Sequence, residues 1–474
     1  MSIYLVVLAL YATALMALGL WIGRRVRGGA DFFVASRQLG PGLIFSTMLA
    51  ANIGAGSTVG ATAQGFVTGL AAAWWVGSAA IGSVVMAFLV GPAMRRVAAS
   101  QNLSSLGDYL EFRYDRRVRA VIALLLWIGS IAILAAQLIA IGTILNYVAG
   151  VPFAWGCAIG GLVVCVYFSA GGLLTSAWVN VVQLIVKIGG FAIALPLAVK
   201  AVGGWNGLTA IGTDRALYWT FWRADVALGY LFAFAPAFVI SPGLLQKVFG
   251  ARDDRAVRLG VGWNAVGLAL YAVVPALLGI AAGGLFPELA DSQQALPAIL
   301  VRTVPPLVGA IGLAAVFSAE VSAADAVLLM LTTSLAQDLY KRYVAPQASD
   351  AQVLRTARIA TIASSTLGVG LAVASRSIVD VLTIFYTLMS VSLFVPVVGG
   401  LFVRRTNTTS ALAAITSGVA AMLVNHVATG GRGWGMVTPA LGGLVAALVA
   451  WTTALLFASD STRGGRMHGN AVQA

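Results

Sequence analysis

Residues 52–60 read NIGAGSTVG and lie inside a long apolar run, where a regular membrane helix would not place three glycines within nine residues. A second interruption follows in a later apolar run, with Pro236 and then Ser241-Pro242-Gly243. Proline removes a backbone hydrogen bond and clashes with the preceding turn. We therefore expect both helices to break within the membrane, at positions where the freed backbone groups line a cavity.

The composition requires lipid as the solvent. Of the 474 residues, 60% are hydrophobic and 9% are charged, whereas a soluble domain carries about 25% charged residues. Thirteen apolar runs are long enough to cross a bilayer. They lie near residues 3–23, 42–69, 71–95, 118–149, 153–169, 172–200, 225–248, 260–286, 305–337, 353–375, 378–403, 408–429 and 435–458.

The two interrupted runs are the second and the seventh, five runs apart. Paired interrupted helices in matching positions indicate an inverted-repeat transporter with a central binding site. We therefore predict an all-α integral membrane protein with about 13 transmembrane helices and a 5+5 core, in which the first helix of each repeat is discontinuous. The expected parts are a peripheral span (1–30), repeat one (31–200), an external loop (201–224), repeat two (225–407), and two peripheral spans with a short cytoplasmic tail (408–474).

The charge distribution predicts the orientation. The net charge is +13, but the basic residues alternate between the two sides of the thirteen spans. With the N-terminus outside, 22 of the 29 Lys and Arg residues fall on the cytoplasmic side and 6 on the other. This bias places the C-terminus in the cytoplasm, and it favours contact with anionic membrane lipids and argues against nucleic acid as a partner. Oligomeric state is left open.

Several motifs resemble the sodium/solute symporters, a family that includes the sugar, proline, pantothenate, choline and monocarboxylate carriers. The resemblance runs from about Asp31 to Asn407, and the order of the motifs makes it specific. The matching stretches are 31–37 (DFFVASR), 49–56 (LAANIGAG), 169–173 (SAGGL) with Trp178 and Gln183, 244–247 (LLQK), 251–253 (ARD), 294–297 (QALP), 322–325 (SAAD) and 338–340 (DLY).

The resemblance implies one co-transported Na⁺, held between the first broken helix and the eighth core helix. By position, its ligands are the carbonyls of Ala50, Ile53 and Ala319 and the hydroxyl of Ser322. The chain departs from the family pattern, since Ala323 replaces a second hydroxyl residue and Asn180 replaces a frequent aspartate. Asp325, three residues beyond Ser322 and on the same helical face, is a compensating acid or else a solvated helix-terminal charge.

The resemblance also implies a solute pocket between the two broken helices. Its expected lining is Asn52, Gly56, Ser57, Trp74, Trp75, Phe234, Phe238 and Tyr386. Ser57, Val76 and Phe234 stand where the sugar carriers of the family have glutamine, glutamate and asparagine. Because an unpartnered buried polar group costs roughly 1–3 kcal/mol, a sugar is disfavoured, and a small amphipathic solute such as an amino acid, a monocarboxylate or a quaternary amine fits better.

Two charged residues, Lys187 and Glu320, lie near the middle of apolar runs, where an ionised side chain costs roughly 3 kcal/mol or more. Three roles for Lys187 stay open. It pairs with Glu320 or Asp325 as a salt bridge, or its ammonium substitutes for the sodium ion or modulates it, or it extends to the membrane surface without a specific role. Glu320 lies about 200° around its helix from Ser322 at 100° per residue and so can point away from the ion site.

These observations predict a sodium-coupled symporter of the cytoplasmic membrane that moves a small organic solute by alternating access. The alternative is a proton-coupled or uncoupled carrier of the same fold that uses Lys187, Glu320 and Asp325. A sensor is disfavoured by the short tail. An enzyme is not expected, because the chain has two histidines, His426 and His468, and no nucleophile cluster. Cys157 and Cys165 share one apolar run and predict neither a disulfide framework nor a metal site.

Overall fold

The structure, a computed structural model, describes residues 3–23, 37–169, 172–215 and 217–457. Across these ranges the chain is helical, and the extended pairings are two isolated bridges, Leu39 with Ala251 and Trp434 with Val437. Residues 31–36 of the first family motif, residues 170–171 of the third, and the basic tail beyond residue 457 lie outside the described residues.

The helices of the N-terminal half follow one another through short connecting turns. Their bounds are α1 Ile3–Gly23, α3 Pro41–Asn52, η2 Gly56–Gly60, α4 Ala61–Thr68, η3 Gly69–Ala72, α5 Ala73–Val85, η4 Met86–Val90, α6 Gly91–Ser100, α7 Leu106–Arg113, α8 Arg116–Ala149, α9 Phe153–Ser169, α10 Gly172–Ala201 and α11 Gly204–Ala210.

The C-terminal half repeats this order of long and interrupted helices and adds two more. Its bounds are α12 Ala224–Ile240, α13 Pro242–Phe249, α14 Asp254–Tyr271, α15 Val273–Leu285, η5 Ser292–Gln294, α16 Ala295–Arg302, α17 Pro306–Thr333, η6 Ser334–Val344, α18 Asp350–Ser375, α19 Ile378–Phe402, α20 Thr408–Thr429 and α21 Pro439–Phe457.

Every one of the thirteen apolar runs lies on helix, and eleven segments of the described chain are long and apolar enough to cross a membrane. The count is lower than thirteen for two reasons. Gly56–Ser100 counts as one segment, although Gly69 with φ +72° ends α4 there, and the apolar part of α9 is shorter than a full span. The chain is therefore a multi-pass membrane protein.

The packing of the helices repeats between the two halves. In the first half α3 packs on α14 and α10, and in the second half α12 packs on α5 and α19, which are the equivalent partners when the halves are exchanged. The remaining core helices pair with their own counterparts, α8 with α17 and α9 with α18. This exchange symmetry confirms the predicted 5+5 core with a discontinuous first helix in each repeat.

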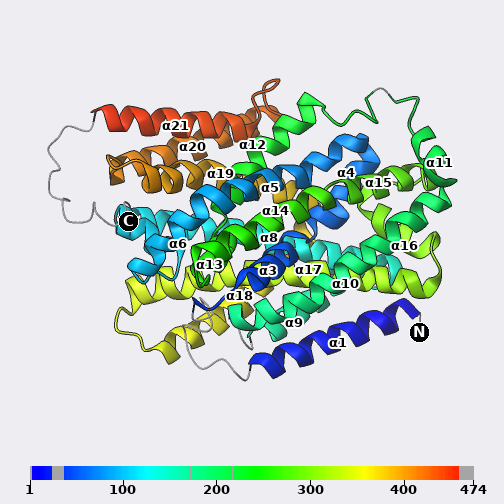
Figure 1. Cartoon of the computed structure of the whole chain (residues 1–474), viewed down its shortest axis with the longest axis horizontal. Coiled ribbons are helices and arrows are strands. Elements are labelled where there is room, and N and C mark those ends of the chain that lie inside the picture. The colour runs from blue at the N-terminus through cyan, green and yellow to red at the C-terminus, as the bar shows by residue number, and fades with distance from the viewer. Residues whose placement is uncertain (1–2, 24–36, 170–171, 216, 458–474) are drawn as a thin grey trace.

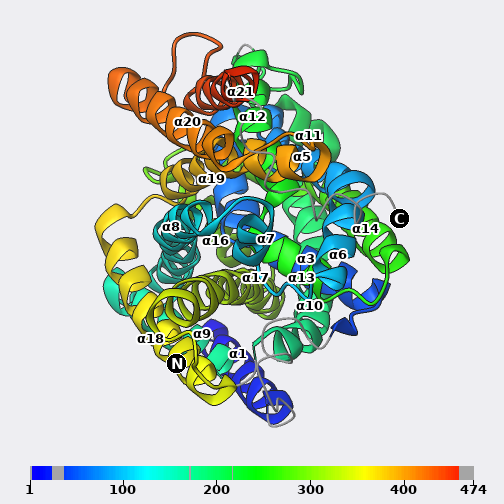
Figure 2. The same ribbon diagram turned by 90° about the vertical axis from the view of Figure 1, so that its left-hand side faces the viewer.

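The outer helices flank this core on opposite edges. Figure 1 shows α1 in dark blue along one edge and α20 and α21 in orange and red along the other, and Figure 2 shows the same separation from the end. The helix α1 packs on α9, α10 and α17, whereas α20 and α21 pack on each other and on α19. In Figure 1, α1 begins at one end of the bundle and α21 ends at the opposite end, as an odd number of crossings requires.

An ionic cluster joins the loops at one end of the bundle. The guanidinium of Arg119, whose side chain is buried, lies 2.7 Å from Asp338, 2.8 Å from Asp108 and 2.9 Å from Glu111. Arg342 also pairs with Glu111. Burial raises the pKa of Glu111, but the hydrogen bonds and charges of the two arginines outweigh it and leave the pKa below its ordinary value. The sequence predicts that these residues lie on the cytoplasmic side.

Candidate functional site

The first broken helix loses its helical form over three residues. The helix α3 ends at Asn52, and Ile53 is extended, with φ −92° and ψ 91°, before η2 begins at Gly56. The Ser57 hydroxyl lies 3.0 Å from the Gly54 amide, from which it accepts a hydrogen bond, and 2.9 Å from the Asn52 carbonyl. These side-chain contacts replace the backbone hydrogen bonds that the helix loses, which allows the break to exist away from water.

Glycine is required at the break because the chain approaches a neighbouring helix closely. A Cβ atom on Gly54 would lie 2.4 Å from the Cβ of Ala323 and 2.7 Å from Oε1 of Gln137. The same Gln137 oxygen accepts a hydrogen bond of 2.8 Å from the Ala55 amide. The glycine-rich sequence thus brings the unwound segment against α8 and α17.

The second broken helix interrupts at a single residue. The helix α12 ends at Ile240, and α13 begins at Pro242, with Ser241 between them at φ −50° and ψ 120°. Proline is favoured in the first turn of a helix, where its missing N–H would have no partner anyway. Pro236 lies inside α12, which continues through it. The predicted break is therefore confirmed at Ser241.

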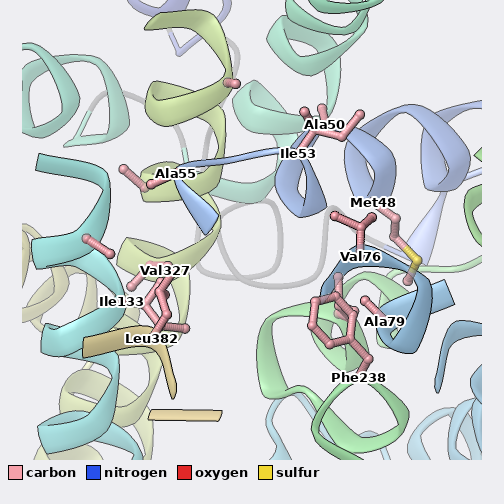
Figure 3. Packing of buried hydrophobic residues seen from close by; sticks show 14 of the residues in the cluster. Met48, Ala50, Ile53, Ala55, Val76, Ala79, Ile133, Phe238, Val327 and Leu382 are labelled. Atoms are coloured by element: carbon pink, nitrogen blue, oxygen red, sulfur yellow. The ribbon is translucent and has the colours of Figure 1, made fainter. Parts of the chain in front are cut away.

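A pocket lies between the two breaks. It is lined by residues of α3, η2, α5, α8, α12, α13, α17 and α19. Seven of the eight residues predicted to line the solute site are on its wall, and the exception is Trp74: Asn52, Gly56, Ser57, Trp75, Phe234, Phe238 and Tyr386. In Figure 3 the wall residues Val76, Ala79 and Phe238 lie on one side of the first break, and Ile133, Val327 and Leu382 lie on the other.

Aromatic rings form one wall of the pocket. The rings of Trp75 and Phe234 meet edge to face with their centroids 4.7 Å apart, and Phe234 meets Tyr386 at 4.9 Å. Trp74, which the sequence also placed in the pocket, faces the other way. Its indole N–H donates a hydrogen bond of 3.0 Å to the carbonyl of Phe221, and its ring packs on Trp222. Consecutive helical residues differ by about 100° in direction, so these tryptophans could not share one wall.

Three of the four predicted ion ligands meet at one point, and the Lys187 nitrogen lies there. Nζ of Lys187 is 2.5 Å from the Ala50 carbonyl and 3.2 Å from the Ile53 carbonyl, and it also contacts the Ser322 hydroxyl. All four residues are at most 2% exposed. Three oxygens from α3, from the break and from α17 therefore converge on the buried Lys187 nitrogen, an arrangement that also suits a small cation.

The other predicted neighbours of the ion lie around this point. The Ala319 carbonyl accepts a hydrogen bond of 3.2 Å from the Ser322 hydroxyl, which keeps it one contact away from the ammonium. Asn180 donates to the Thr47 hydroxyl at 3.0 Å, on the turn of α3 before Ala50. Asp325 is buried on α17, one turn beyond Ser322.

One of the three roles considered for Lys187, extension to the membrane surface, disagrees with this geometry. The side chain is fully buried and does not extend to the membrane surface. Among the contacts of the described residues it forms no direct ion pair with Glu320, because Oε1 of Glu320 instead accepts a hydrogen bond of 2.7 Å from Thr58. The contacts of Lys187 place its nitrogen among the oxygens predicted to bind the ion, and its role there stays a prediction.

Sequence reasoning missed three polar partners of the site. Gln137 supports the break, Thr58 holds Glu320, and Asn264 accepts a hydrogen bond of 3.1 Å from the Asn52 side chain. Each is a buried polar residue within an apolar helix, and that was the signal available in the sequence. The sequence could not reveal which of these polar residues would meet.

Comparison with known proteins agrees with this architecture. The sequence profile described as "Sodium:solute symporter family" matches residues 32–418. The chain is 26% identical to the sodium/pantothenate symporter of Escherichia coli, over 82% of each chain, and 23% identical to the sodium/glucose cotransporter of Vibrio parahaemolyticus, over 76% of this chain and 72% of the relative. The solved structure of a Na⁺-coupled sialic acid symporter superposes with a TM-score of 0.83 at 20% identity, covering 97% of this chain and 98% of the other.

These similarities cover most of the chain and include both broken helices. The relatives are transporters, so the chain is a transporter and not an enzyme. The family description and the relatives indicate Na⁺ as the co-transported ion and sodium-coupled symport as the activity. With a family profile matched over most of its length, the chain belongs to the sodium:solute symporter family.

Proposed function

We propose that this protein moves a small organic solute into the cell together with a cation, by alternating access across the cytoplasmic membrane. One observation carries the proposal: the residues of the first break serve both sites. Asn52 and Gly54 line the pocket, while the Ile53 carbonyl between them faces the cation position. A shift of this segment on binding one partner alters the site of the other, and such coupling acts equally in both directions.

The pocket wall supports a compact amphipathic solute. No charged side chain is among the described residues that line it, and its aromatic wall offers little polar surface. Its two nearest polar side chains are already engaged, Ser57 with the backbone of the break and Asn52 with Asn264. A sugar would leave many hydroxyls without partners at roughly 1–3 kcal/mol each.

The start of α13 favours a carboxylate on the solute. Gly243 and Leu244, in the first turn of α13, line the pocket. The N-terminus of a helix carries partial positive charge, and discontinuous helices in transporters direct such ends at anionic substrate groups. An amino acid or a monocarboxylate is therefore the proposed solute class, and a quaternary amine is the competing outcome.

The cation position suggests how binding drives the change of access. The first break belongs to the group formed by α3, α4, α5 and α12–α15, whereas Ser322 belongs to α17 in the group of α8, α9 and α18. A cation that contacts both groups stabilises one arrangement of the interface between them. Rocking of one group against the other around the pocket then exposes it to each side in turn.

The distribution of basic residues supports an orientation with the N-terminus outside and the C-terminus in the cytoplasm. Arg119 and Arg342 lie at the end of the bundle with the ionic cluster, and Arg95 and Arg96 pair with Asp254. That end would face the anionic lipids of the inner leaflet.

Uptake into proteoliposomes tests this function. Purified protein should accumulate a radiolabelled amino acid or monocarboxylate more strongly under an inward Na⁺ gradient than with Na⁺ equal on both sides, while glucose uptake stays at the level of empty vesicles.

A Gly56→Ala variant should lose uptake, because its Cβ would lie 2.7 Å from Leu382 and 3.2 Å from the Trp75 indole nitrogen. Gly77→Ala is the matched control, with nothing within 4 Å of the new Cβ. Absence of gradient-driven uptake across the solute panel would refute the proposal.

A proton-coupled or uncoupled carrier of the same fold is the second candidate. The observation that favours it is the Lys187 ammonium, which already supplies a positive charge to the oxygens expected to bind Na⁺. Uptake that responds to a pH gradient, or to neither gradient, and not to Na⁺ would favour this candidate.

A further inference from the structure

The oxygens at the first break are arranged as three acceptors around one donor group. A lysine ammonium offers three N–H donors and no acceptor. Here the three contacts of Nζ are the Ala50 carbonyl, the Ile53 carbonyl and the Ser322 hydroxyl, which together account for that donor capacity. The Lys187 nitrogen is therefore held by a complete set of acceptors and is not merely buried.

The same oxygens cannot bind Na⁺ while the ammonium is present. Both cations need the free lone pairs of the two carbonyls, and the ammonium occupies the point at which the oxygens converge. Like charges at such a separation also repel strongly in a buried site. Glu320, the acid whose charge acts on Lys187, is hydrogen-bonded to Thr58, so it does not neutralise the ammonium by direct contact.

From this geometry we propose that Lys187 is a built-in competitor of Na⁺ at the cation site between α3 and α17. The residue is tethered in the middle of α10, a helix that packs on both α3 and α17. A tethered group acts at an effective concentration of the order of millimolar or higher. Sodium therefore binds this site only in the fraction of molecules from which the ammonium has withdrawn, and the apparent affinity falls by that fraction.

This inference refines the proposed function, because it concerns how the cation enters the same site. It predicts that sodium dependence in this chain is weak and that removal of one side chain strengthens it. Gain of Na⁺ binding on loss of a positive residue is a result that a purely structural role for Lys187 would not produce.

The test is direct binding of ²²Na⁺ to purified protein, which needs no knowledge of the solute. Lys187→Ala should bind ²²Na⁺ roughly tenfold or more tightly than the wild type, since a tenfold gain means that the ammonium leaves the site in about a tenth of molecules. Adding Ser322→Ala to Lys187→Ala should remove the gain, because it deletes one of the freed oxygens. Lys200→Ala, at the exposed end of the same helix, is the matched control and should behave as the wild type.

A folded, monodisperse Lys187→Ala protein that binds ²²Na⁺ no more tightly than the wild type overturns the inference. If that variant does not fold, Lys187→Met keeps most of the side-chain volume and takes its place. The inference is also overturned if the wild type binds ²²Na⁺ tightly and Ser322→Ala abolishes that binding. The Lys187 ammonium would then not compete with Na⁺ at this site. Failure of the proposed function would be recognised by a different result. In that case neither the wild type nor any variant takes up a solute, whatever the Na⁺ binding results.

Discussion

The two broken helices occupy equivalent places in the two repeats, yet their chemistry differs. The first break spans three residues, contains Gly54 and exposes carbonyls that hold the Lys187 ammonium. The second break is a single residue, Ser241, followed by a proline. Symmetric packing thus places two interruptions beside one pocket, but the carbonyls that contact the Lys187 nitrogen belong to the first alone. The comparison teaches that the fold provides the pair of breaks, whereas the local sequence decides which one binds a cation.

The largest expected difference between the two breaks is in solute uptake when a glycine of each break is replaced by alanine. Gly54→Ala should reduce solute uptake by about tenfold or more, because its Cβ would lie 2.4 Å from Ala323 on a packed helix and overpacking commonly costs 1–3 kcal/mol. Gly243→Ala should keep most of the uptake, since its nearest neighbours are Cγ and Sδ of the flexible Met330, both at 3.1 Å. Initial uptake rates of the two variants, normalised to protein in the vesicle, check this. Equal losses would show that the breaks are equivalent.

An intermediate difference is expected in the Na⁺ dependence of uptake when each of the two fully buried lysines that contact α3 is replaced. Lys247, from the helix after the second break, donates a hydrogen bond of 2.8 Å to the Thr47 carbonyl, which lies within α3 and away from the break. Lys187→Met should lower the Na⁺ concentration for half-maximal uptake roughly tenfold. Lys247→Met should lower thermal stability and leave that concentration unchanged within a factor of about two.

Sodium titrations of uptake, together with the melting temperature of each variant, distinguish the two lysines. Lys247 contacts none of the three oxygens around the Lys187 nitrogen, so its substitution should leave the Na⁺ dependence unchanged. An equal shift of the Na⁺ dependence in both variants would contradict the distinction between the two breaks.

The smallest expected difference is in the free energy of unfolding when the serine of each break, Ser57 or Ser241, is replaced by alanine. Ser57→Ala removes the acceptor of the Gly54 amide and should lower the free energy of unfolding by about 1 kcal/mol. Ser241→Ala should change it by less than about 0.5 kcal/mol, because the Ser241 side chain makes no capping hydrogen bond to α13. Thermal unfolding in one detergent provides the measurement, with a similar loss for both serines as the contradicting result.

Sequence alone predicted the long-range design well. The length of the apolar runs predicted the helices, and the glycines and prolines predicted both breaks. Glycine and proline act on the local backbone, so their effect can be predicted without knowing which residues lie nearby in the fold. The solute-site residues and the ligands Ala50, Ile53 and Ser322 came from the family resemblance, which carries spatial information that composition lacks. Both sets are close together in the structure.

The sequence could not decide what Lys187 contacts. Its depth in the membrane matches that of Glu320, and depth alone suggests an ion pair. The direction of a side chain around its helix depends on packing between α3, α10 and α17, which only the folded chain defines. Thr58, one turn beyond the break, takes Glu320 instead. The part of Asp325 and Asn180 in ion binding stays a prediction.

A high-resolution experimental map of the Lys187→Ala protein in sodium, beside one of the wild type, tests the cation site most directly. The account predicts an ion density bounded by the Ala50 and Ile53 carbonyls and the Ser322 hydroxyl in the variant, and the Lys187 nitrogen at that point in the wild type. A wild-type map in which Lys187 turns away from an intact, continuous α3 would contradict it.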